Sequence, residues 1–424
     1  MHDFKELSFI DEKIYEDTIN GLRVFYIPKA GFAKSYAIMT ADYGSKDVEF
    51  SIDGGETFRR YPEGIAHFLE HKLFEMPGGE NIFNRFTEQG ASVNAFTNNR
   101  QTSYYFSCTE NFYENLELLL RMVTTPHLTE ENVEKEKGII AEEIAMYEDN
   151  PGFRGYLEAM KALYHKHPVR EDIAGTKESI YSLTAQDLID CYNAFYNPKN
   201  MILVIVGDLD ADRLDTLIAE NVKPREDISI VKKAYDEPFS SLKKEAVCEM
   251  NLQVPNYILA YKMGRTEEDL LKESLTGAML SRLVFGRSSE FFEKNLKEGH
   301  LNDSFSSEFN LEADHGEFFL GGESKEPEKM EKILKDFVDE VKKDEDFFDR
   351  KASEIELIKK SMTGNFMNVF NGIDSIGTFV TGFILRKKSL YEYVQVLREI
   401  SPKDLKDKFF EIFNDENNAY IIIR

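Results

Sequence analysis

Cysteine is scarce in this chain of 424 residues, which contains only Cys108, Cys191 and Cys248. Their wide spacing fits neither a disulfide framework nor the paired cysteines of a structural zinc site. We therefore expect all three to be small, buried side chains that pack in a core.

Basic residues are outnumbered by acidic residues, 52 against 77, which gives the chain a formal net charge of -25. Binding to a phosphate backbone needs a concentrated basic surface, so the composition argues against nucleic acid as a partner. The charge has two interpretations. It favours solubility in any case, and if acidic residues gather in a cleft it would also attract basic peptides.

Long apolar runs are absent as well. No run approaches the eighteen residues of a membrane-spanning helix, and residues 1–6 lack the basic and apolar segments of an export signal. The hydrophobic fraction of 42% and the charged fraction of 30% are typical of a globular chain. We expect a cytoplasmic protein with no membrane partner.

Histidine is also rare, yet two of the eight histidines lie within one pentapeptide, His67-Phe68-Leu69-Glu70-His71. In a helix, His67 and His71 lie one turn apart on nearly the same face, a spacing that suits two nitrogen ligands of one zinc ion. Glu70 lies on the adjoining strip, within reach of a water bound to that metal. The order H-x-x-E-H inverts the commoner H-E-x-x-H and is the mark of inverted zincins.

A short motif also arises by chance, so a partly buried helix with two hydrogen-bonded histidines is the alternative interpretation of the pentapeptide. A catalytic zinc takes three protein ligands and keeps one position open, so a third ligand should lie on another element. A third candidate ligand elsewhere in the sequence would favour the zinc site over the buried helix.

The third ligand is sought on a long helix predicted over Glu130–Glu148. Glu136, Ile140, Glu143 and Tyr147 recur there on one stripe, and the apolar Ile140 suggests that this stripe faces inward. Buried carboxylates need a compensating partner, which a metal ion with its histidines would supply.

A solvated acidic helix is the alternative interpretation of the same segment. Spacing alone does not choose Glu143 over Glu142.

The pentapeptide, together with residues 136–144 (E-K-G-I-I-A-E-E-I), resembles the pitrilysin/insulinase family of zinc peptidases. Mitochondrial processing peptidase and shorter bacterial proteins belong to that family. The resemblance implies that His67, His71 and Glu143 bind one zinc ion per chain, with Glu136 as a supporting carboxylate. It also implies that Glu70 is the catalytic base.

Two further segments carry the same resemblance. Residues 90–97 (G-A-S-V-N-A-F-T) are similar to the family's G-x-x-x-N-A-x-T strand, and residues 147–151 to the run that often ends the glutamate helix. We expect Asn94, Ala95 and Phe96 to bind an extended peptide by β-augmentation. The alternative for Asn94 is a turn or sheet-edge residue that bonds nearby backbone.

The two halves of the chain repeat each other over about two hundred residues. In each half a helix with an N-terminal capping box leads through a turn to a strand: Thr184 and Asp187 precede the strand at 201–207, and Ser401 and Asp404 precede the strand at 419–423. Pro402 occupies the first helical position of the second copy.

This repeat predicts an α+β fold with two homologous domains, each a mostly antiparallel sheet covered by helices. Expected strands include 22–28, 35–41, 103–108, 257–261 and 317–321. The predicted boundaries are 1–225 for the zinc-bearing domain, 226–245 for a linker and 246–424 for the second domain. The family resemblance implies that the two domains face each other across a cleft.

The repeat is asymmetric in its chemistry. The segment 275–283 (L-T-G-A-M-L-S-R-L), which corresponds to the histidine helix, has no ligand set. In the family, the second half supplies an Arg and a Tyr that grip the substrate, but residues 291–305 contain neither. The resemblance therefore implies a heterodimer with a homologous subunit that lacks the zinc motif, ahead of a homodimer.

Together these patterns predict a zinc-dependent endopeptidase that hydrolyses peptides or leader and pro-segments. The alternative is a non-proteolytic structural or chaperone-like subunit. The remaining histidines after residue 71 are expected to have no metal role, namely His127, His165, His167, His300 and His315.

Overall fold

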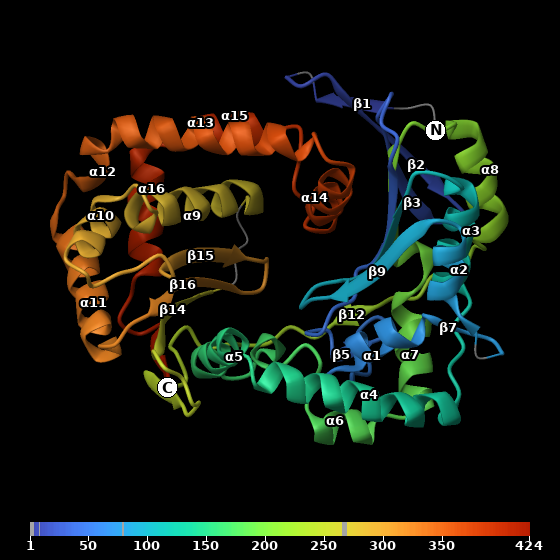
Figure 1. The fold of residues 1–424 in the computed structure, drawn as a ribbon, viewed down its shortest axis with the longest axis horizontal. Coiled ribbons are helices and arrows are strands. Elements are labelled where there is room, and N and C mark those ends of the chain that lie inside the picture. The colour runs from blue at the N-terminus through green and yellow to red at the C-terminus, as the bar shows by residue number, and fades with distance from the viewer. Residues whose placement is uncertain (1–3, 8, 79, 265–268) are drawn as a thin grey trace. The chain divides into compact units, whose positions relative to one another are not determined.

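The computed structural model describes residues 4–7, 9–78, 80–264 and 269–424 of the chain, which fold into two compact units of mixed helices and sheets (Figure 1). Unit 1 comprises residues 1–145, 171–234 and 367–391, and unit 2 comprises 146–170, 235–366 and 392–424. The predicted fold class is confirmed. All three cysteines are free and buried, as expected.

A seven-stranded sheet forms the centre of unit 1, in the order β1-β2-β3-β11-β4-β10-β9. Every neighbouring pair is antiparallel except β3 with β11, which is parallel. The strands are β1 (Phe4–Leu7), β2 (Glu12–Ile19), β3 (Leu22–Pro28), β4 (Ser35–Ala41), β9 (Ala91–Thr97), β10 (Thr102–Cys108) and β11 (Met201–Gly207).

The five-stranded sheet of unit 2 repeats this topology in the order β13-β17-β14-β16-β15. Here β13 and β17 are the one parallel pair, in the place that β3 and β11 take in unit 1. The strands are β13 (Glu245–Cys248), β14 (Asn256–Met263), β15 (Ser306–Leu311), β16 (Gly316–Glu323) and β17 (Asn418–Ile423). The shared strand order supports the internal repeat that the sequence predicts.

Both predicted capping boxes are present. Thr184 and Asp187 bond each other's backbone amides at the start of α7 (Ala185–Phe195), and Ser401 and Asp404 do so at the start of α16 (Pro402–Ile412). Each satisfies two amide groups that a helix N-terminus otherwise leaves unpaired, which explains why both copies retain the pattern.

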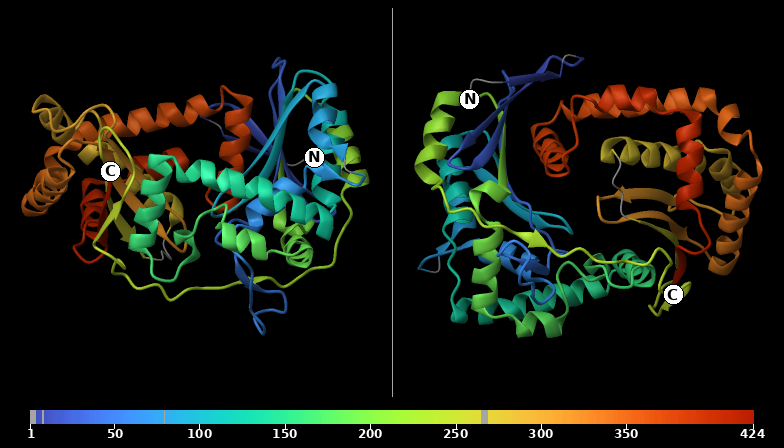
Figure 2. Two further views of the ribbon diagram at one scale, coloured as in Figure 1. Left: turned by 60° about the horizontal axis from the view of Figure 1, so that its bottom comes forward. Right: turned by 180° about the vertical axis from the view of Figure 1, so that it is seen from behind.

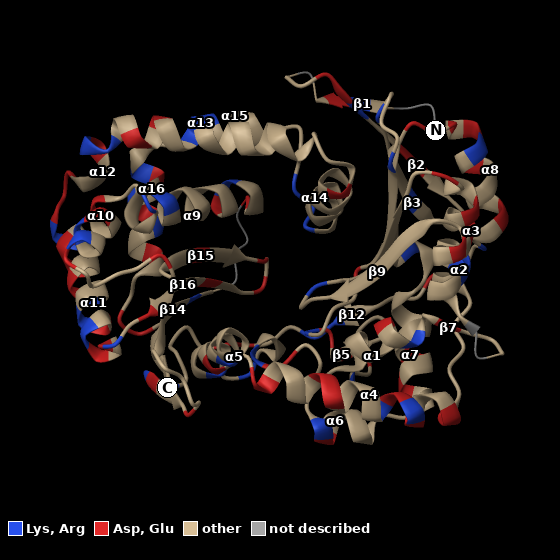
Figure 3. Ribbon diagram, in the orientation of Figure 1, with Lys and Arg blue, Asp and Glu red and all other residues tan. Residues whose placement is uncertain are grey.

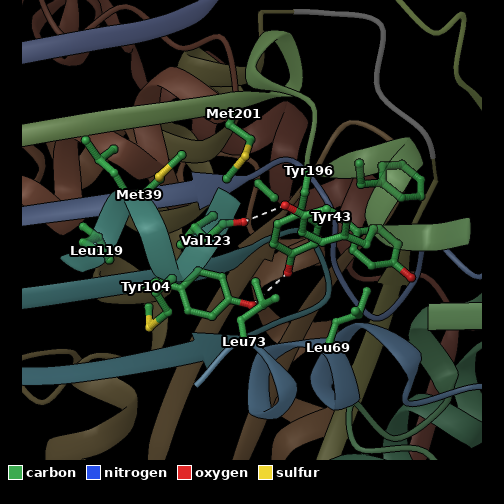
Figure 4. Packing of buried hydrophobic residues seen from close by; sticks show 14 of the residues in the cluster. Met39, Tyr43, Leu69, Leu73, Tyr104, Leu119, Val123, Tyr196 and Met201 are labelled. Atoms are coloured by element: carbon green, nitrogen blue, oxygen red, sulfur yellow. Dashed lines mark hydrogen bonds between the residues drawn. The ribbon is translucent and has the colours of Figure 1, made fainter. Parts of the chain in front are cut away.

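Helices cover the sheet of unit 1, and buried side chains fill the space between them (Figure 4). Leu69 of α1 and Leu73, the residue that follows α1, belong to this cluster. The hydroxyl groups of Tyr104 on β10 and Tyr196 share a hydrogen bond of 2.9 Å. The helices are α1 (Ile65–Lys72), α2 (Ile82–Glu88), α3 (Phe112–Thr124), α4 (Glu130–Glu148), α6 (Lys177–Ser182), α7 and α8 (Ala211–Asn221).

Unit 2 has its own set of covering helices, and acidic and basic residues are interspersed along them (Figure 3). They are α9 (Leu270–Phe285), α10 (Glu290–Lys297), α11 (Pro327–Lys343), α12 (Phe347–Arg350), α13 (Ala352–Val369), α15 (Tyr393–Glu399) and α16. Among the described residues, no helix is long and apolar enough to span a bilayer. Short strands complete the fold as β5 (Glu49–Ser51), β6 (Arg59–Arg60), β7 (Glu75–Met76), β8 (Glu80–Asn81) and β12 (Val231–Lys232).

One helix from each half of the sequence packs on the sheet of the other half (Figures 1 and 2). The helix α5 (Pro151–Leu163) lies on β14 and β17, where Ala159 and Met160 join a buried cluster with Ile421. In return, α14 (Ile373–Leu385) lies on β4 and β11. The boundaries of the compact units therefore differ from those of the predicted domains, because the predicted domains follow the sequence repeat. The role of residues 226–245 as a linker stays a prediction.

Each exchanged helix approaches its sheet through a glycine at its fifth position. A Cβ atom on Gly155 of α5 would lie 2.9 Å from Ile423 Cδ1, and one on Gly377 of α14 would overlap the ring of Tyr36. The missing side chain thus sets the distance between helix and sheet in both copies.

We predict that Gly377→Ala destabilises the protein by about 1–3 kcal/mol, because the added methyl group forces Tyr36 to move within a packed interface. The matched control is Gly364→Ala on α13, where an added Cβ meets no heavy atom within 4 Å. That change should be neutral or stabilising by up to about 1 kcal/mol, because alanine favours helix. Denaturant unfolding of both variants checks this, and equal midpoints for the two would contradict it.

Candidate metal centre

The helix α1 places the pentapeptide against the core of unit 1. Its N-terminal neighbour Gly64 has a φ of 88°, a left-handed conformation that only glycine adopts readily, and a Cβ there would overlap the carbonyl oxygen of Ala174. Phe68 and Leu69 are fully buried on one side of α1. Burial of each such side chain contributes roughly 1.5–3 kcal/mol, which anchors the helix and turns its other side toward α4.

His67 and His71 lie one turn apart on α1, with ring centroids separated by 4.6 Å. Glu143 of α4 faces both rings: its Oε1 lies 3.6 Å from His67 Nε2, and its Oε2 lies 3.3 Å from His71 Nε2. Tetrahedral zinc with bonds of about 2.0–2.1 Å holds its ligand atoms roughly 3.4 Å apart. The two imidazoles and Glu143 therefore have the spacing of three ligands around one ion.

Glu136 sets the tautomer of His71. Its Oε1 lies 3.0 Å from His71 Nδ1, so in the neutral ring Nδ1–H donates to this carboxylate and the lone pair is on Nε2, the nitrogen that faces Glu143. Metal-binding histidines commonly donate their other ring N–H to a carboxylate in this manner. The donor set of two imidazole nitrogens and one carboxylate is typical of zinc, and the site fits that ion.

His67 is less completely satisfied, because its buried Nδ1 has no hydrogen-bond partner. A neutral His67 that binds metal through Nε2 must carry its proton on Nδ1. An unsatisfied buried donor costs about 1–3 kcal/mol, which metal binding has to offset.

The electrostatics favour deprotonated forms at most of these positions. Burial and the neighbouring His71 lower the pKa of His67 to about 4. A hydrogen bond with His71 lowers the pKa of Glu143 against the opposing effect of burial. For His71, burial opposes protonation, but hydrogen bonds to Glu136 and Glu143 outweigh it and raise the pKa to about 9. Metal binding at neutral pH would thus release a proton from His71.

Glu70 points into the same region from α1 and is only 9% exposed. Burial raises the pKa of its carboxyl group, although Thr97 on β9 donates a hydrogen bond of 2.6 Å to its Oε2 and favours the ionised form. A raised pKa makes a buried carboxylate a stronger base than an exposed one, which suits a group that takes up and returns a proton.

One further residue at the centre, Lys72, was missed by sequence reasoning. Lys72 is 1% exposed, and its Nζ forms an ion pair with Glu75 and lies 3.7 Å from Glu136 Oε2. The one available signal was a lysine directly after the motif on an otherwise apolar helix. The buried charge of Glu136 thus has a cationic partner within the chain itself.

The predicted inward stripe of α4 is confirmed in part. Ile140 is fully buried, and Glu136 and Glu143 are partly buried beside the histidines. The prediction was wrong for Tyr147, which is 38% exposed. Glu142 is exposed, so the structure separates it from Glu143, which spacing alone did not.

The strand β9, which carries Asn94, Ala95 and Phe96, forms one edge of the seven-stranded sheet. Its pairing with β10 leaves the opposite side of the strand unpaired within the sheet. The side chain of Asn94 accepts a hydrogen bond of 2.8 Å from the amide of Ala95, the local bond that was the alternative for this residue. A peptide that pairs with this amide must displace Asn94.

A second group with metal-ligand residue types lies in unit 2, formed by His167, Asp314 and His315. The two histidines lie beside each other, with ring centroids 5.1 Å apart. However, the amide of Val169 donates to His167 Nδ1 at 3.2 Å, so the proton of a neutral His167 is on Nε2, which lies 3.4 Å from Asp314 Oδ2. With Nε2 protonated, His167 has no lone pair to offer a metal, and the group is better described as hydrogen-bonded.

Comparison with known families shows two matches that together extend over most of the chain. Residues 48–177 match the model described as Insulinase (Peptidase family M16), and residues 182–360 match the Peptidase M16 inactive domain. The first match contains His67, His71 and Glu143. The second contains α9, the counterpart of the histidine helix, which carries no histidine.

Curated proteins and solved structures agree with these matches. The chain is 38% identical over 412 residues to YmfH of Bacillus subtilis, named an uncharacterized zinc protease, and the match covers 95% of this chain and 94% of that protein. The crystal structure of an M16-like peptidase from Alicyclobacillus acidocaldarius superposes with a TM-score of 0.92 at 32% identity, covering 97% and 98% of the two chains. A Helicobacter pylori protease shares the fold with a TM-score of 0.83 at 20% identity, covering 97% and 99%.

We predict that Glu143→Gln weakens zinc binding far more than Glu142→Gln. Removal of a residue that only supports a metal ligand typically lowers metal affinity about 10- to 100-fold. Removal of a ligand itself should therefore lower zinc affinity at least as much. Competition with a chelating indicator measures both dissociation constants. If Glu142→Gln weakens binding while Glu143→Gln does not, the assignment of the third ligand is wrong.

Proposed function

Because this chain belongs to peptidase family M16, the insulinase family, we propose that it is a zinc-dependent endopeptidase that hydrolyses extended peptides. The observation that carries the proposal is the convergence of His67 Nε2, His71 Nε2 and Glu143 on one point beside the buried Glu70. Relatives named zinc proteases support the choice of zinc.

In this proposal His67, His71 and Glu143 hold the ion, and Glu136 orients His71. An ion held by these residues would supply Lewis-acid chemistry: it would lower the pKa of a bound water toward about 7 and would polarise the scissile carbonyl. Glu70 accepts the proton of the attacking water and returns it to the leaving amine. Thr97 holds the carboxylate of Glu70 through its hydroxyl group and so restricts the direction in which Glu70 accepts that proton.

The edge strand β9 supplies the substrate platform of the proposal. An extended peptide would add to this edge through backbone hydrogen bonds, with Ala95 and Phe96 as contacts after Asn94 has released the Ala95 amide. Backbone pairing gives affinity with little sequence selection, which is suited to leader or pro-segments of varied sequence.

A homologous partner subunit that lacks the zinc motif is the second part of the proposal, with a homodimer as the less favoured arrangement. It is supported by the absence of Arg and Tyr from residues 291–305, the stretch that grips substrate in the family. In this proposal the partner supplies those groups, and the pair acts in the cytoplasm.

We predict that Glu70→Gln lowers kcat/KM for a quenched fluorescent peptide by a factor on the order of 10²–10⁴, because it removes the general base. Its zinc affinity should stay close to that of the wild type, since Glu70 is not a ligand. Glu142→Gln, an exposed change of the same kind, serves as the control and should retain activity.

The assay is run with the chain alone and with a copurified homologous subunit. If the chain binds zinc stoichiometrically yet cuts no peptide in either form, the peptidase proposal fails and the non-proteolytic subunit is the better account.

A further inference from the structure

Lys72 is a fully buried cation that the proposed reaction does not use. Only 1% of its surface is exposed, and removing an ammonium group from water costs several kilocalories per mole unless it is paired. Its Nζ forms an ion pair with Glu75 and lies 3.7 Å from Glu136 Oε2. The burial is therefore compensated by carboxylates, one of which belongs to the metal centre.

Glu136 joins this lysine to the metal centre. Its Oε1 accepts from His71 Nδ1 at 3.0 Å, while Oε2 faces Lys72, so the two oxygens have different partners on consecutive residues of α1. Glu136 is held from both sides and cannot turn without losing one contact. The orientation of the His71 ring depends on that carboxylate.

The charges around the site give Lys72 a second effect. Glu136 and Glu143 lie 3.0 Å and 3.3 Å from the two nitrogens of His71, so two carboxylates bring negative charge to one ring. Hydrogen bonds with His71 and Lys72 keep the pKa of Glu136 low despite its burial. Lys72 thus offsets part of the negative charge that Glu136 brings to the centre.

We propose that Lys72 is a positioning residue of the metal centre, which acts through Glu136 on His71. This inference rests on the proposed function, because it concerns the affinity of the same site for zinc. A positioning role differs from a purely structural role in one respect. If Lys72 positions the site, its effect on zinc affinity depends on the presence of Glu136.

The test is a double-mutant cycle of zinc affinity with Lys72→Met, Glu136→Gln and the combination of both. Each single change should raise the zinc dissociation constant about 10- to 100-fold. The double variant should bind zinc about as weakly as the weaker single variant, because residues that act in one chain of contacts are not additive. Lys72→Arg, which keeps the charge, should restore part of the affinity.

Lys137→Met is the matched control, since Lys137 is a buried lysine on α4 whose Nζ donates to Glu134 at 2.8 Å and to the carbonyl oxygen of Tyr181 at 3.1 Å. It should leave zinc affinity unchanged. The inference would be overturned if the double variant's loss of zinc affinity equalled the product of the two single losses. It would also be overturned if Lys72→Met bound zinc as tightly as the wild type. Failure of the wild type itself to bind zinc would instead count against the proposed function.

A second inference comes from a separate cavity in unit 1 and does not depend on peptidase activity. The cavity has a volume of about 310 Å³ and lies where β1, β2 and β3 meet the end of α14. Lys5, Arg23, Lys387 and Lys388 line it together with one carboxylate, Glu16. In a chain whose acidic residues outnumber basic ones 77 to 52, four cations at one cavity are unusual.

The cavity lining itself contacts these cations, since the Nζ atom of Lys5 lies 5.6 Å from the centroid of the Tyr391 ring. Arg23 pairs with Glu16 at 2.8 Å. The amides of Lys387 and Lys388 donate to Ile384 O and Phe383 O at 3.0 Å, so backbone bonds already satisfy these carbonyls at the end of α14. Lys387 adopts a φ of 54°, a left-handed conformation that is uncommon for lysine at a helix end, where glycine is usual.

Apolar side chains form the rest of the lining, including the buried Val380 and Leu390. A cavity of this size with an apolar wall and a cationic rim matches a small amphiphilic ligand. Four strand spacings separate β3 from β9, about 20 Å, so the cavity lies apart from the metal centre. We infer that it binds a small acid with a short apolar body, such as an alkyl phosphate or carboxylate.

Calorimetric titration with octyl phosphate tests this inference, with octanol as the uncharged probe. We expect one site per chain, weaker binding of octanol, and a dissociation constant about tenfold higher in Lys5→Gln/Lys387→Gln. Lys223→Gln, an exposed change in the same unit, should leave binding unchanged. Absence of saturable binding, or equal binding by the double variant, would overturn the inference.

Discussion

The hydrogen bond between Glu136 and His71 is the interaction on which the metal centre depends. It fixes the proton of His71 on Nδ1 and directs Nε2 toward Glu143, and it ties α4 to α1 at the point where the ligands meet. The group of His167, Asp314 and His315 differs at one ring. Asp314 Oδ1 lies 2.8 Å from His315 Nδ1, but a backbone amide donates to His167 Nδ1 and leaves the proton of that ring on Nε2. Thus the hydrogen bond on the far side of each ring decides which nitrogen can bind a metal.

The duplicated scaffold holds this centre in one copy only. Both sheets have one parallel strand pair at the same place, and each receives a helix from the other half of the sequence. Gly155 and Gly377 occupy the same position in the exchanged helices, so the repeat extends to the close approach of helix and sheet. The histidine helix has a counterpart in α9 without histidine, which agrees with the match of the second half to an inactive domain.

Much of the fold was predictable from local patterns. The strands at 22–28, 35–41 and 201–207 and the helix at 130–148 have the predicted bounds. Short apolar runs and the helical spacing of inward residues are signals that act over short distances. The exchange of α5 and α14 was not predictable, since it depends on contacts between residues far apart in the sequence. Likewise, helical spacing placed Glu136 and Glu143 on one stripe, but only packing shows that Tyr147 on that stripe is exposed and that Lys72 is buried beside Glu136.

X-ray absorption at the zinc edge of the zinc-loaded protein tests the central claim most directly. Our account predicts one zinc per chain with two imidazoles and oxygen ligands at about 2.0–2.1 Å, and loss of the imidazole signal in His67→Gln/His71→Gln. It predicts no change in His167→Gln/His315→Gln. Retention of two imidazoles in the first variant, or their loss in the second, would contradict the account.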